Sequence, residues 1–255
     1  MPFIQRAAYA SKSLLGRSRA GRIANHAAKL AAGLYFDVFQ RTYRTEGMAF
    51  SVPREQTTIS LRGKFAVDTY ELPERILVKR YLPRDATVLE LGGCIGVLSC
   101  VINSRLDRPD THVVVEANPN LVPILEHNRD SNRAKFCIEN CVVSRDASAK
   151  IAIARNMDSS TVGHEGVAVP TMALEELEAK HGLTFDAIVM DIEGGEASFI
   201  AENADKLRRV RFLMVEFHPS LIGEGAVAHL RGLLAGAGLK KTDAMLATEV
   251  YTRRE

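Results

Sequence analysis

The fold of this chain is decided by the stretch Val88-Leu89-Glu90-Leu91-Gly92-Gly93-Cys94-Ile95-Gly96-Val97-Leu98. An apolar run typical of a buried parallel strand stops here at closely spaced glycines, where the backbone can turn sharply, and an apolar helix follows. The next apolar run ends at Glu116, twenty residues after Gly96. The pattern predicts the first half of a nucleotide-binding βαβ unit, in which Glu116 accepts hydrogen bonds from both hydroxyls of an adenosine ribose.

The glycine spacing indicates which nucleotide binds. Dinucleotide sites use G-x-G-x-x-G, whose backbone N–H groups neutralise a pyrophosphate. Here Gly92, Gly93 and Gly96 form G-G-x-x-G, and Glu90 precedes them. A carboxylate at this position would repel a diphosphate but suits a ligand with an ammonium group, so we expect S-adenosylmethionine in preference to NAD. The simpler alternative is that the glycines only allow close packing of helix and strand.

The composition is that of a soluble globular protein of 255 residues, 46% hydrophobic and 25% charged. We expect one Rossmann-like domain over residues 51–255 and a basic helical arm over residues 1–50. No apolar run is long enough to span a bilayer, and the start has no apolar segment before a cleavage site, so we expect a cytoplasmic location. The cysteines lack C-x-x-C spacing and are interpreted as small buried hydrophobes, apart from Cys94 inside the glycine loop.

The N-terminal arm carries most of the positive charge. Residues 1–44 have a net charge of +7, whereas the remainder has −5. An apolar helical face is formed by Ile23, Ala27, Leu30, Leu34 and Val38. Packing with a solvated basic face is the simplest interpretation, and a homodimer contact or peripheral contact with an anionic membrane are the alternatives. Nucleic acid is disfavoured as a partner, because the aromatic residues follow the basic run and are not interleaved with it.

Beyond about residue 50, strand and helix patterns alternate. Strands are predicted at residues 87–91, 112–116, 135–139, 185–190 and 210–216, with helices near 72–81, 96–106, 119–132, 172–181, 195–207 and 224–237. Shorter features are a strand or hairpin around 57–65, an extra strand at 150–154, a polar loop at 156–166, and closing strands at 239–242 and 248–252. The alternation predicts an α/β fold with a doubly wound, mostly parallel sheet.

Polar clusters follow three of the predicted strands. They are Asn140-Cys141 after the third strand, Asp191-Ile192-Glu193-Gly194-Gly195-Glu196 after the fourth, and Glu216-Phe217-His218 at the end of the fifth. In open α/β sheets, ligands bind beyond the carboxyl ends of the strands. We therefore place Asn140 and Cys141 at the adenine edge and the other two clusters at the reacting end of the cofactor.

The segments LELGGCIG, VVVEANPN, ENCVVS, MDIEGGE and VEFHP, in this order and spacing, resemble the FkbM-type methyltransferases. The resemblance covers roughly residues 65–225, and the D-x-E-G-x-E element is its most specific part. It implies the Rossmann-like fold of S-adenosylmethionine-dependent methyltransferases and methyl transfer to hydroxyl oxygens of sugars, glycolipids or natural products. The chain departs from the family pattern at Cys94, where asparagine is more usual, and in its basic arm.

Methyl transfer to an alcohol requires the acceptor oxygen to lie in line with the leaving sulfur and to lose its proton. The residues proposed for this task are Asp191, Glu193 and His218, with His218 preferred as the base because imidazole titrates near neutral pH. Asp191 is also expected beside the cofactor, and either Asp191 or Glu216 is expected to orient His218. A divalent metal at Asp191, Glu193 and His218 is a less favoured alternative.

The sequence favours two other classes of function less. An NAD-dependent oxidoreductase would need the dinucleotide glycine pattern and a catalytic tyrosine–lysine or histidine pairing, which the sequence does not show. A non-catalytic S-adenosylmethionine-binding or scaffold protein would keep Glu116 and the glycines but would lack a base near the methyl group. The candidate bases at the strand ends favour an enzyme, for which the expected partner is a small-molecule or glycan acceptor.

Overall fold

The computed structural model describes residues 19–153, 157, 161–163 and 166–253. The chain forms two compact units, Met1–Leu72 and Pro73–Glu255. The first contains α2 (Arg19–Tyr35), η1 (Phe36–Gln40), β1 (Thr42–Thr45), β2 (Met48–Ser51), η2 (Arg54–Gln56) and α3 (Ile59–Ala66). The division into an arm over 1–50 and a domain over 51–255 stays a prediction, and residues 1–18 of that arm lie outside the described part.

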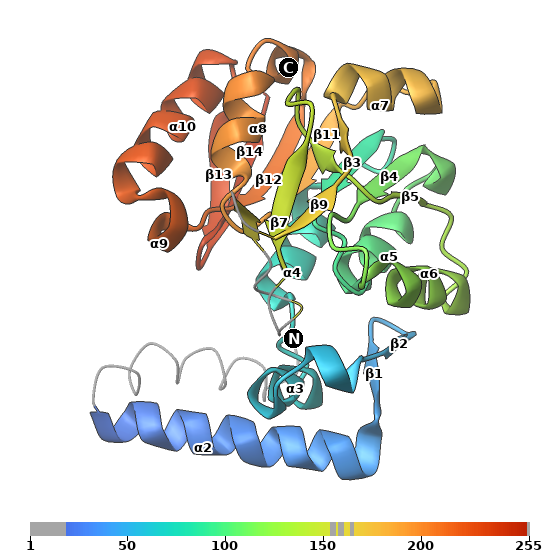
Figure 1. The fold of residues 1–255 in the computed structure, drawn as a ribbon, viewed down its shortest axis with the longest axis vertical. Helices are drawn as coiled ribbons and strands as arrows, with labels where there is room; N and C mark the ends of the chain where they lie inside the picture. Colours follow the sequence, from blue (N-terminus) through green and yellow to red (C-terminus); the bar gives the residue numbers. More distant parts are fainter. Residues whose placement is uncertain (1–18, 154–156, 158–160, 164–165, 254–255) are drawn as a thin grey trace. The chain divides into compact units, whose positions relative to one another are not determined.

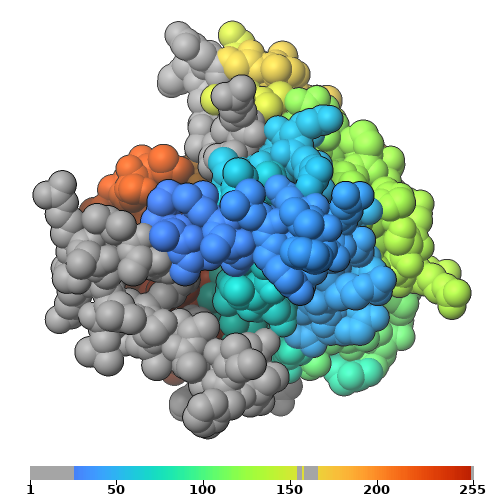
Figure 2. Space-filling view, turned by 90° about the horizontal axis from the view of Figure 1, so that it is seen from below, coloured from blue at the N-terminus to red at the C-terminus, as the bar shows by residue number. Residues whose placement is uncertain are grey.

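The predicted basic helix is present as α2, and it packs closely on α3. A Cβ atom added to Gly33 would lie 1.9 Å from the carbonyl oxygen of Ile59, and one added to Gly63 would lie 2.3 Å from that of Lys29. Only small residues fit at this crossing, so the contact does not use the predicted apolar face. Leu34 and Val38 of that face are exposed, and the side chain of Ile23 lies outside the described residues. Figure 2 looks onto this unit, with α2 and η1 in blue.

The strand or hairpin predicted around 57–65 is wrong, because this segment forms α3. The hydroxyl of Thr58 accepts a hydrogen bond from the N–H of Leu61 at 3.1 Å and caps the helix. Leu61 and Phe65, four residues apart, then bury the same helical face. A hairpin does form earlier, between β1 and β2, around Glu46 and Gly47, both with positive φ. The arm is therefore not wholly helical.

The second unit contains a seven-stranded sheet (Figure 1). Its order is β13 (Lys240–Met245), β14 (Thr248–Thr252), β12 (Phe212–Glu216), β11 (Ala187–Met190), β3 (Val88–Leu91), β4 (His112–Val115) and β5 (Cys137–Glu139). The pairs from β12 to β5 are parallel, whereas β14 is antiparallel to both β12 and β13. The predicted doubly wound, mostly parallel sheet is confirmed, and β3 is the point where the strand order switches, with β4 and β5 on one side and β11 and β12 on the other.

Helices cover both faces of this sheet. They are α4 (Leu72–Tyr81), α5 (Val97–Asn103), η3 (Pro109–Thr111), α6 (Val122–Ser131), α7 (Leu174–His181), α8 (Glu196–Glu202), η4 (Lys206–Arg209), α9 (Pro219–Ile222) and α10 (Glu224–Gly236). Alternate strand residues point to opposite faces. Ile188 and Met190 of β11 therefore pack with α7, α8 and α10, whereas Ala187 and Val189 pack with α4 and α5. This is a three-layer αβα arrangement.

The region between β5 and α7 adds two small sheets. One pairs β6 (Val142–Val143) with β10 (Thr171–Met172), and the other joins β7 (Ala149–Ala152), β8 (Thr161–Gly163) and β9 (Val167–Val169). The predicted strand at 150–154 corresponds to β7. The loop predicted over 156–166 is partly wrong, because β8 pairs with β7 there, and several of its residues lie outside the described part.

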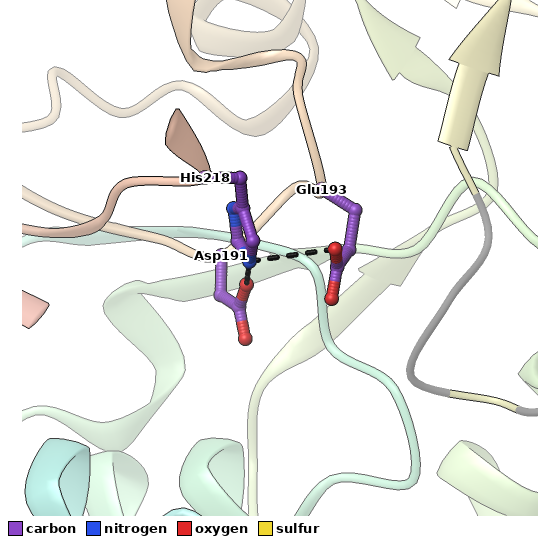
Figure 3. A group of neighbouring side chains, drawn as sticks. All are labelled: Asp191, Glu193 and His218. Atoms are coloured by element: carbon purple, nitrogen blue, oxygen red, sulfur yellow. Dashed lines mark ion pairs between the residues drawn. The ribbon is translucent and has the colours of Figure 1, made fainter. Parts of the chain in front are cut away.

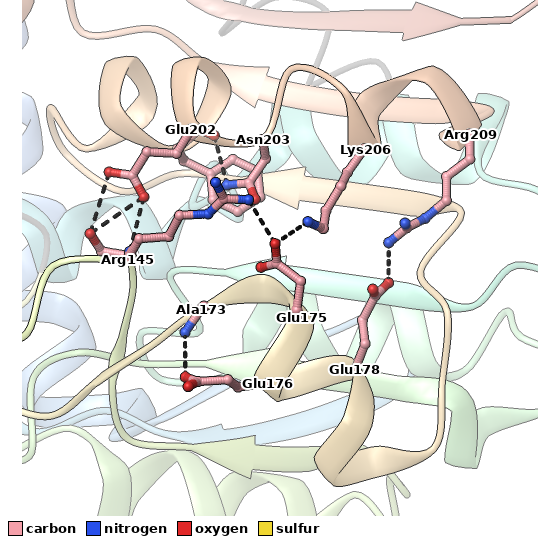
Figure 4. A network of polar contacts seen from close by, with 11 residues as sticks. Arg145, Ala173, Glu175, Glu176, Glu178, Glu202, Asn203, Lys206 and Arg209 are labelled. Carbon is pink, nitrogen blue, oxygen red and sulfur yellow. Dashed lines mark hydrogen bonds and ion pairs between the residues drawn. The ribbon is translucent and has the colours of Figure 1, made fainter.

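Ion pairs fasten α7 to η4 and to the loop after β6 (Figure 4). Arg145 contacts Glu175 at 2.6 Å, and Lys206 pairs with the same carboxylate. The Lys206 hydrogen bond lowers the pKa of Glu175 to about 2. Arg209 pairs with Glu178 on α7. These contacts hold the helices on one face of the sheet and leave its carboxyl edge to the candidate site.

No helix in the described part of the chain has the length and apolar character needed to cross a bilayer. Cys100 and Cys141 are buried as predicted, Cys94 is partly exposed, and Cys137 is exposed, so the prediction of burial is wrong for Cys137. Cys137 opens the edge strand β5, where fewer neighbours cover the side chains.

Candidate functional site

The glycine loop follows β3 and turns through unusual backbone conformations. Positive φ values occur at Gly92 (94°), Cys94 (47°) and Gly96 (83°). The N–H groups of Gly92 and Gly93 both donate to the carbonyl of Val115 on β4, at 2.9 and 3.2 Å. The loop is thereby held against the end of β4, directly before Glu116.

Two of the glycines are required by close contacts with the protein itself. A Cβ atom on Gly92 would lie 2.0 Å from the carbonyl oxygen of Asp191, and one on Gly93 would lie 2.4 Å from a methyl carbon of Val114. The packing role weighed from the sequence is therefore present at Gly93. At Gly92 the close approach brings the loop to the backbone of Asp191, so the predicted cofactor loop and the predicted catalytic turn touch.

Glu116 lies at the end of β4 and is 7% exposed. Its two carboxylate oxygens accept hydrogen bonds from the N–H groups of Cys94 and Asn118, each at 2.7 Å. Burial raises the pKa of Glu116 to about 7, although these hydrogen bonds oppose the shift. Each carboxylate oxygen has a second lone pair, so ribose hydroxyls can still donate to it. The placement fits the predicted ribose contact.

Asn140 and Cys141 follow β5. The Asn140 amide donates to the carbonyls of Glu116 and Ala117, at 2.7 and 3.2 Å. The Cys141 side chain is buried in the core, and burial raises its pKa to about 11. Asn140 therefore holds the backbone around Glu116. A role for Cys141 at the adenine edge would have to use its backbone, because its thiol points into the core.

Glu90 lies beneath the glycine loop and is 1% exposed. One of its oxygens accepts from the hydroxyl of Ser99 at 2.8 Å, and the other lies 2.9 Å from Nε2 of His112. The carboxylate is thus engaged inside the protein. Direct contact between Glu90 and a cofactor ammonium stays a prediction.

The structure brings together the three residues predicted for catalysis. Asp191 and Glu193 follow β11, and His218 follows β12, its parallel neighbour in the sheet. The Nε2 atom of His218 lies 3.7 Å from Oδ1 of Asp191 and 3.4 Å from Oε2 of Glu193. Figure 3 shows both carboxylates turned toward the imidazole. Glu193 and Gly194 have φ of 43° and 98°, which folds the turn back toward His218.

Glu196 is the member of the site whose role the sequence did not reveal. Its side chain is fully buried, and Oε1 lies 2.5 Å from Nδ1 of His218. The sequence favoured Glu216 or Asp191 as the group that orients His218, but the structure gives this hydrogen bond to Glu196 in the first turn of α8. The spacing D-x-E-G-G-E was the available signal, since a tight glycine turn can return a third carboxylate to the same point.

The electrostatics of the site are dominated by carboxylates. Burial raises the pKa of Asp191 well above its usual range, and the charges of Glu216, Glu193 and Glu74 add to the shift. For His218, burial lowers the pKa, but the Glu196 hydrogen bond and the nearby carboxylates outweigh it and raise the pKa to about 9. The imidazole is therefore mostly protonated at neutral pH, and negative charge remains in excess around it.

The site can perform three tasks side by side. Glu116 can hold a ribose. Asp191 lies in backbone contact with the glycine loop at Gly92. His218 and Glu193, next to Asp191, can accept a proton or hold a cation. Glu216, at the end of β12, adds its charge to the same region. This arrangement suits a reaction in which a nucleophile is activated beside a bound nucleoside.

Comparison with known proteins identifies a family to which the chain is similar. The sequence model of the methyltransferase FkbM domain matches residues 90–241, more than half of the chain and all of the site described above. No curated protein matches the chain.

Solved structures with a similar fold come from several organisms. A methyltransferase from Pyrococcus furiosus is 11% identical, with a TM-score of 0.46 over 92% of this chain and 98% of that one. A precorrin-6y C5,15-methyltransferase from Geobacter metallireducens is 10% identical, with a TM-score of 0.46 over 80% and 94%. A protein of the NADB-Rossmann superfamily from Streptococcus agalactiae is 15% identical, with a TM-score of 0.45 over 71% and 68%.

Proposed function

The chain belongs to the FkbM methyltransferase family, and from that premise we propose that it is an S-adenosylmethionine-dependent O-methyltransferase acting on a hydroxyl of a carbohydrate, glycolipid or natural product. The observation that carries the proposal is the contact between the two halves of the site. The N–H of Asp191 donates to the carbonyl of Leu91 at 3.0 Å, directly before the glycine loop. The acceptor-activating turn and the cofactor loop are therefore adjacent.

The residues fit the cofactor at its ribose. Glu116 is buried at the end of β4 and keeps lone pairs for two hydroxyl donors while backbone N–H groups fix its orientation. When bound, S-adenosylmethionine supplies an electrophilic methyl group to a nucleophile placed in line with its sulfur. The protein has to orient the acceptor oxygen and remove its proton.

The proposed hydroxyl-activating group is Asp191, Glu193 and His218. Glu196 fixes the ring of His218 through Nδ1, which turns Nε2 toward the two other carboxylates. His218 stays our predicted base, but with a pKa of about 9 only about one molecule in a hundred carries a free imidazole at pH 7. Burial also raises the pKa of the neighbouring Asp191 carboxyl well above its usual range. A hydroxyl acceptor is favoured over an amine because a surplus of carboxylates would bind an amine in its unreactive ammonium form.

Labelled cofactor and a panel of acceptors test this function. We expect methyl transfer to hydroxyl-bearing sugars or glycolipids and none to matched amines. His218→Asn and Asp191→Asn should each lower turnover about 10²–10⁴-fold with little change in cofactor affinity. His181→Asn is the matched control, since His181 also pairs with a carboxylate, that of Glu139, at 2.9 Å. Cofactor binding without transfer to any acceptor would instead indicate a binding or scaffold protein.

The N-terminal unit carries a surface that fits an anionic membrane. Its exposed apolar side chains are Leu34 (54%), Tyr35 (52%), Val38 (60%) and Phe39 (74%), which lie one turn apart on the end of α2 and on η1. Residues 1–44 have a net charge of +7. An apolar strip on a basic segment is the composition of helices that lie in the interface of an anionic bilayer. We therefore propose peripheral membrane contact through this strip, with a cytoplasmic enzyme meeting a lipid-linked acceptor, and a dimer contact as the competing outcome.

A further inference from the structure

The imidazole of His218 lies close to two carboxylates but beyond hydrogen-bond distance of either. Nε2 lies 3.7 Å from Oδ1 of Asp191 and 3.4 Å from Oε2 of Glu193. Direct N–H···O hydrogen bonds span about 2.7–3.2 Å, so both separations are too long for them. Two donors that share one cation at about 2.1 Å and a tetrahedral angle are about 3.4 Å apart. The separation from Glu193 equals this value, and the separation from Asp191 is slightly wider.

The nitrogen that would bind the ion is oriented by a buried partner. Glu196 Oε1 lies 2.5 Å from Nδ1, and the Glu196 side chain has no exposed surface. A carboxylate that accepts from one ring nitrogen leaves the lone pair of the other nitrogen for a metal, and this pairing is the common support of metal-bound histidines. Here that second nitrogen is Nε2, which faces Asp191 and Glu193.

Two buried oxygens of this site have no hydrogen-bond partner. They are Oδ1 of Asp191, which faces Nε2, and Oε2 of Glu196. A buried polar atom that lacks a partner is destabilising, so it points to a ligand that the protein alone does not supply. The donor atoms of Asp191, Glu193 and His218 all lie within 4.8 Å of one another.

The charge of the surroundings favours a cation with more than one charge. Three carboxylates, those of Asp191, Glu193 and Glu196, lie around the imidazole of His218, and Glu216 adds its charge at Asp191. A divalent cation at this point would compensate more of the negative charge than a singly charged group can. Buried charge without a partner is strongly unfavourable.

We propose that Asp191, Glu193 and His218 form a binding site for a divalent transition-metal ion of the Mn²⁺ type, with Glu196 as the outer carboxylate that orients His218. The mixed set of two carboxylate oxygens and one imidazole nitrogen suits Mn²⁺ or Zn²⁺ better than Mg²⁺, which prefers oxygen ligands only. Three protein ligands leave further positions open. In an enzyme with the function proposed above, on which this last step rests, an open position would be available to the acceptor hydroxyl and His218 would be a ligand, whereas without the ion His218 is free to act as the base.

The metal site is tested without cofactor, acceptor or turnover. The full-length protein, first treated with chelator, is titrated with Mn²⁺ alone while electron paramagnetic resonance follows the free ion. One saturable ion per chain is expected. Asp191→Asn, Glu193→Gln and His218→Asn should each abolish saturable binding over the same concentration range, and Glu196→Gln should weaken it about 10–100-fold. Glu139→Gln and His181→Asn, which break a separate imidazole–carboxylate pair of the unit, should leave it unchanged.

Absence of saturable Mn²⁺ binding in the parent protein would overturn the proposal, and so would binding that survives all three ligand substitutions. Should a ligand variant fail to fold, the Glu196→Gln titration and a crystal soaked in Mn²⁺ test the proposal instead. In the crystal, the anomalous Mn²⁺ peak must lie between the three donor atoms. Cofactor binding is measured separately by calorimetry with S-adenosylhomocysteine. A protein that binds Mn²⁺ but no cofactor would refute the proposed function while keeping the metal site.

Discussion

Replacing Glu116 by glutamine should weaken cofactor binding and remove its dependence on pH. The pKa of Glu116 in the free protein is about 7, because burial outweighs two backbone hydrogen bonds. Ribose hydroxyls donate to the ionised carboxylate, so cofactor binding favours the deprotonated form. Affinity should therefore rise as pH rises through 7. About one-tenth of the carboxylate is ionised at pH 6 and about nine-tenths at pH 8, which predicts about a tenfold difference in affinity.

The glutamine variant also has a direct effect. The carboxylate accepts from Cys94 and Asn118 at 2.7 Å each, and a glutamine amide can accept at only one of its two ends. Loss of a charge-assisted acceptor corresponds to about 1–3 kcal/mol, or about a 5- to 150-fold weaker complex at pH 8. Glu116→Ala should give a loss of the same order.

Calorimetry with S-adenosylhomocysteine between pH 5.5 and 8.5 measures both effects without turnover. Glu139→Gln is the control, because Glu139 ends the neighbouring strand β5 but pairs with Lys180 and His181. It should keep the affinity and the pH slope of the parent protein. A parent affinity that is flat across this range, or a slope that persists unchanged in Glu116→Gln, would show that Glu116 does not bind the ribose.

Three further predictions follow from other parts of the structure. Gly92→Ala should destabilise the fold by about 2–5 kcal/mol in urea denaturation, because the new Cβ would meet a carbonyl oxygen at 2.0 Å and φ is +94°. Gly232→Ala is the control: this position faces open space on α10, so the substitution should stabilise the fold by up to about 1 kcal/mol. Leu34→Ser with Phe39→Ser should abolish sedimentation with anionic vesicles, and a change in oligomeric state instead would indicate a dimer surface. If the metal-free enzyme uses His218 as its base, turnover should rise up to about pH 9 and then level off, and the His218→Asn variant should lack this rise.

The sequence predicted where in the fold the site lies, but not all of the contacts between its side chains. Asp191 and His218 could be brought together in advance, because each ends an apolar run and parallel strands present their carboxyl ends at one edge of a sheet. The part of Glu196 could not be derived in this way. Its reach to His218 depends on the backbone of the intervening turn, where φ is 43° at Glu193 and 98° at Gly194, and a pattern of residue types does not encode those angles.

The remaining differences have similar local causes. The contact of Glu90 with the cofactor ammonium, expected from its charge and spacing, stays a prediction, whereas its hydrogen bonds with Ser99 and His112 could not be predicted from the local pattern. Residues 57–65 alternate in a way that also suits a strand. The cap at Thr58 and the close contact with α2 decide for a helix, and a tertiary contact of this kind is invisible to local periodicity.

The close approach between Gly92 and the carbonyl of Asp191 has a consequence for anyone who wishes to redesign this enzyme. Acceptor specificity would ordinarily be altered by exchanging the turn after β11 for that of a relative, while the glycine loop is left untouched. Here the two segments are in direct backbone contact at Gly92 and Asp191, with no side chain between them. A grafted turn that shifts by a fraction of an ångström would push on the glycine loop, so the two segments have to be transplanted as a pair.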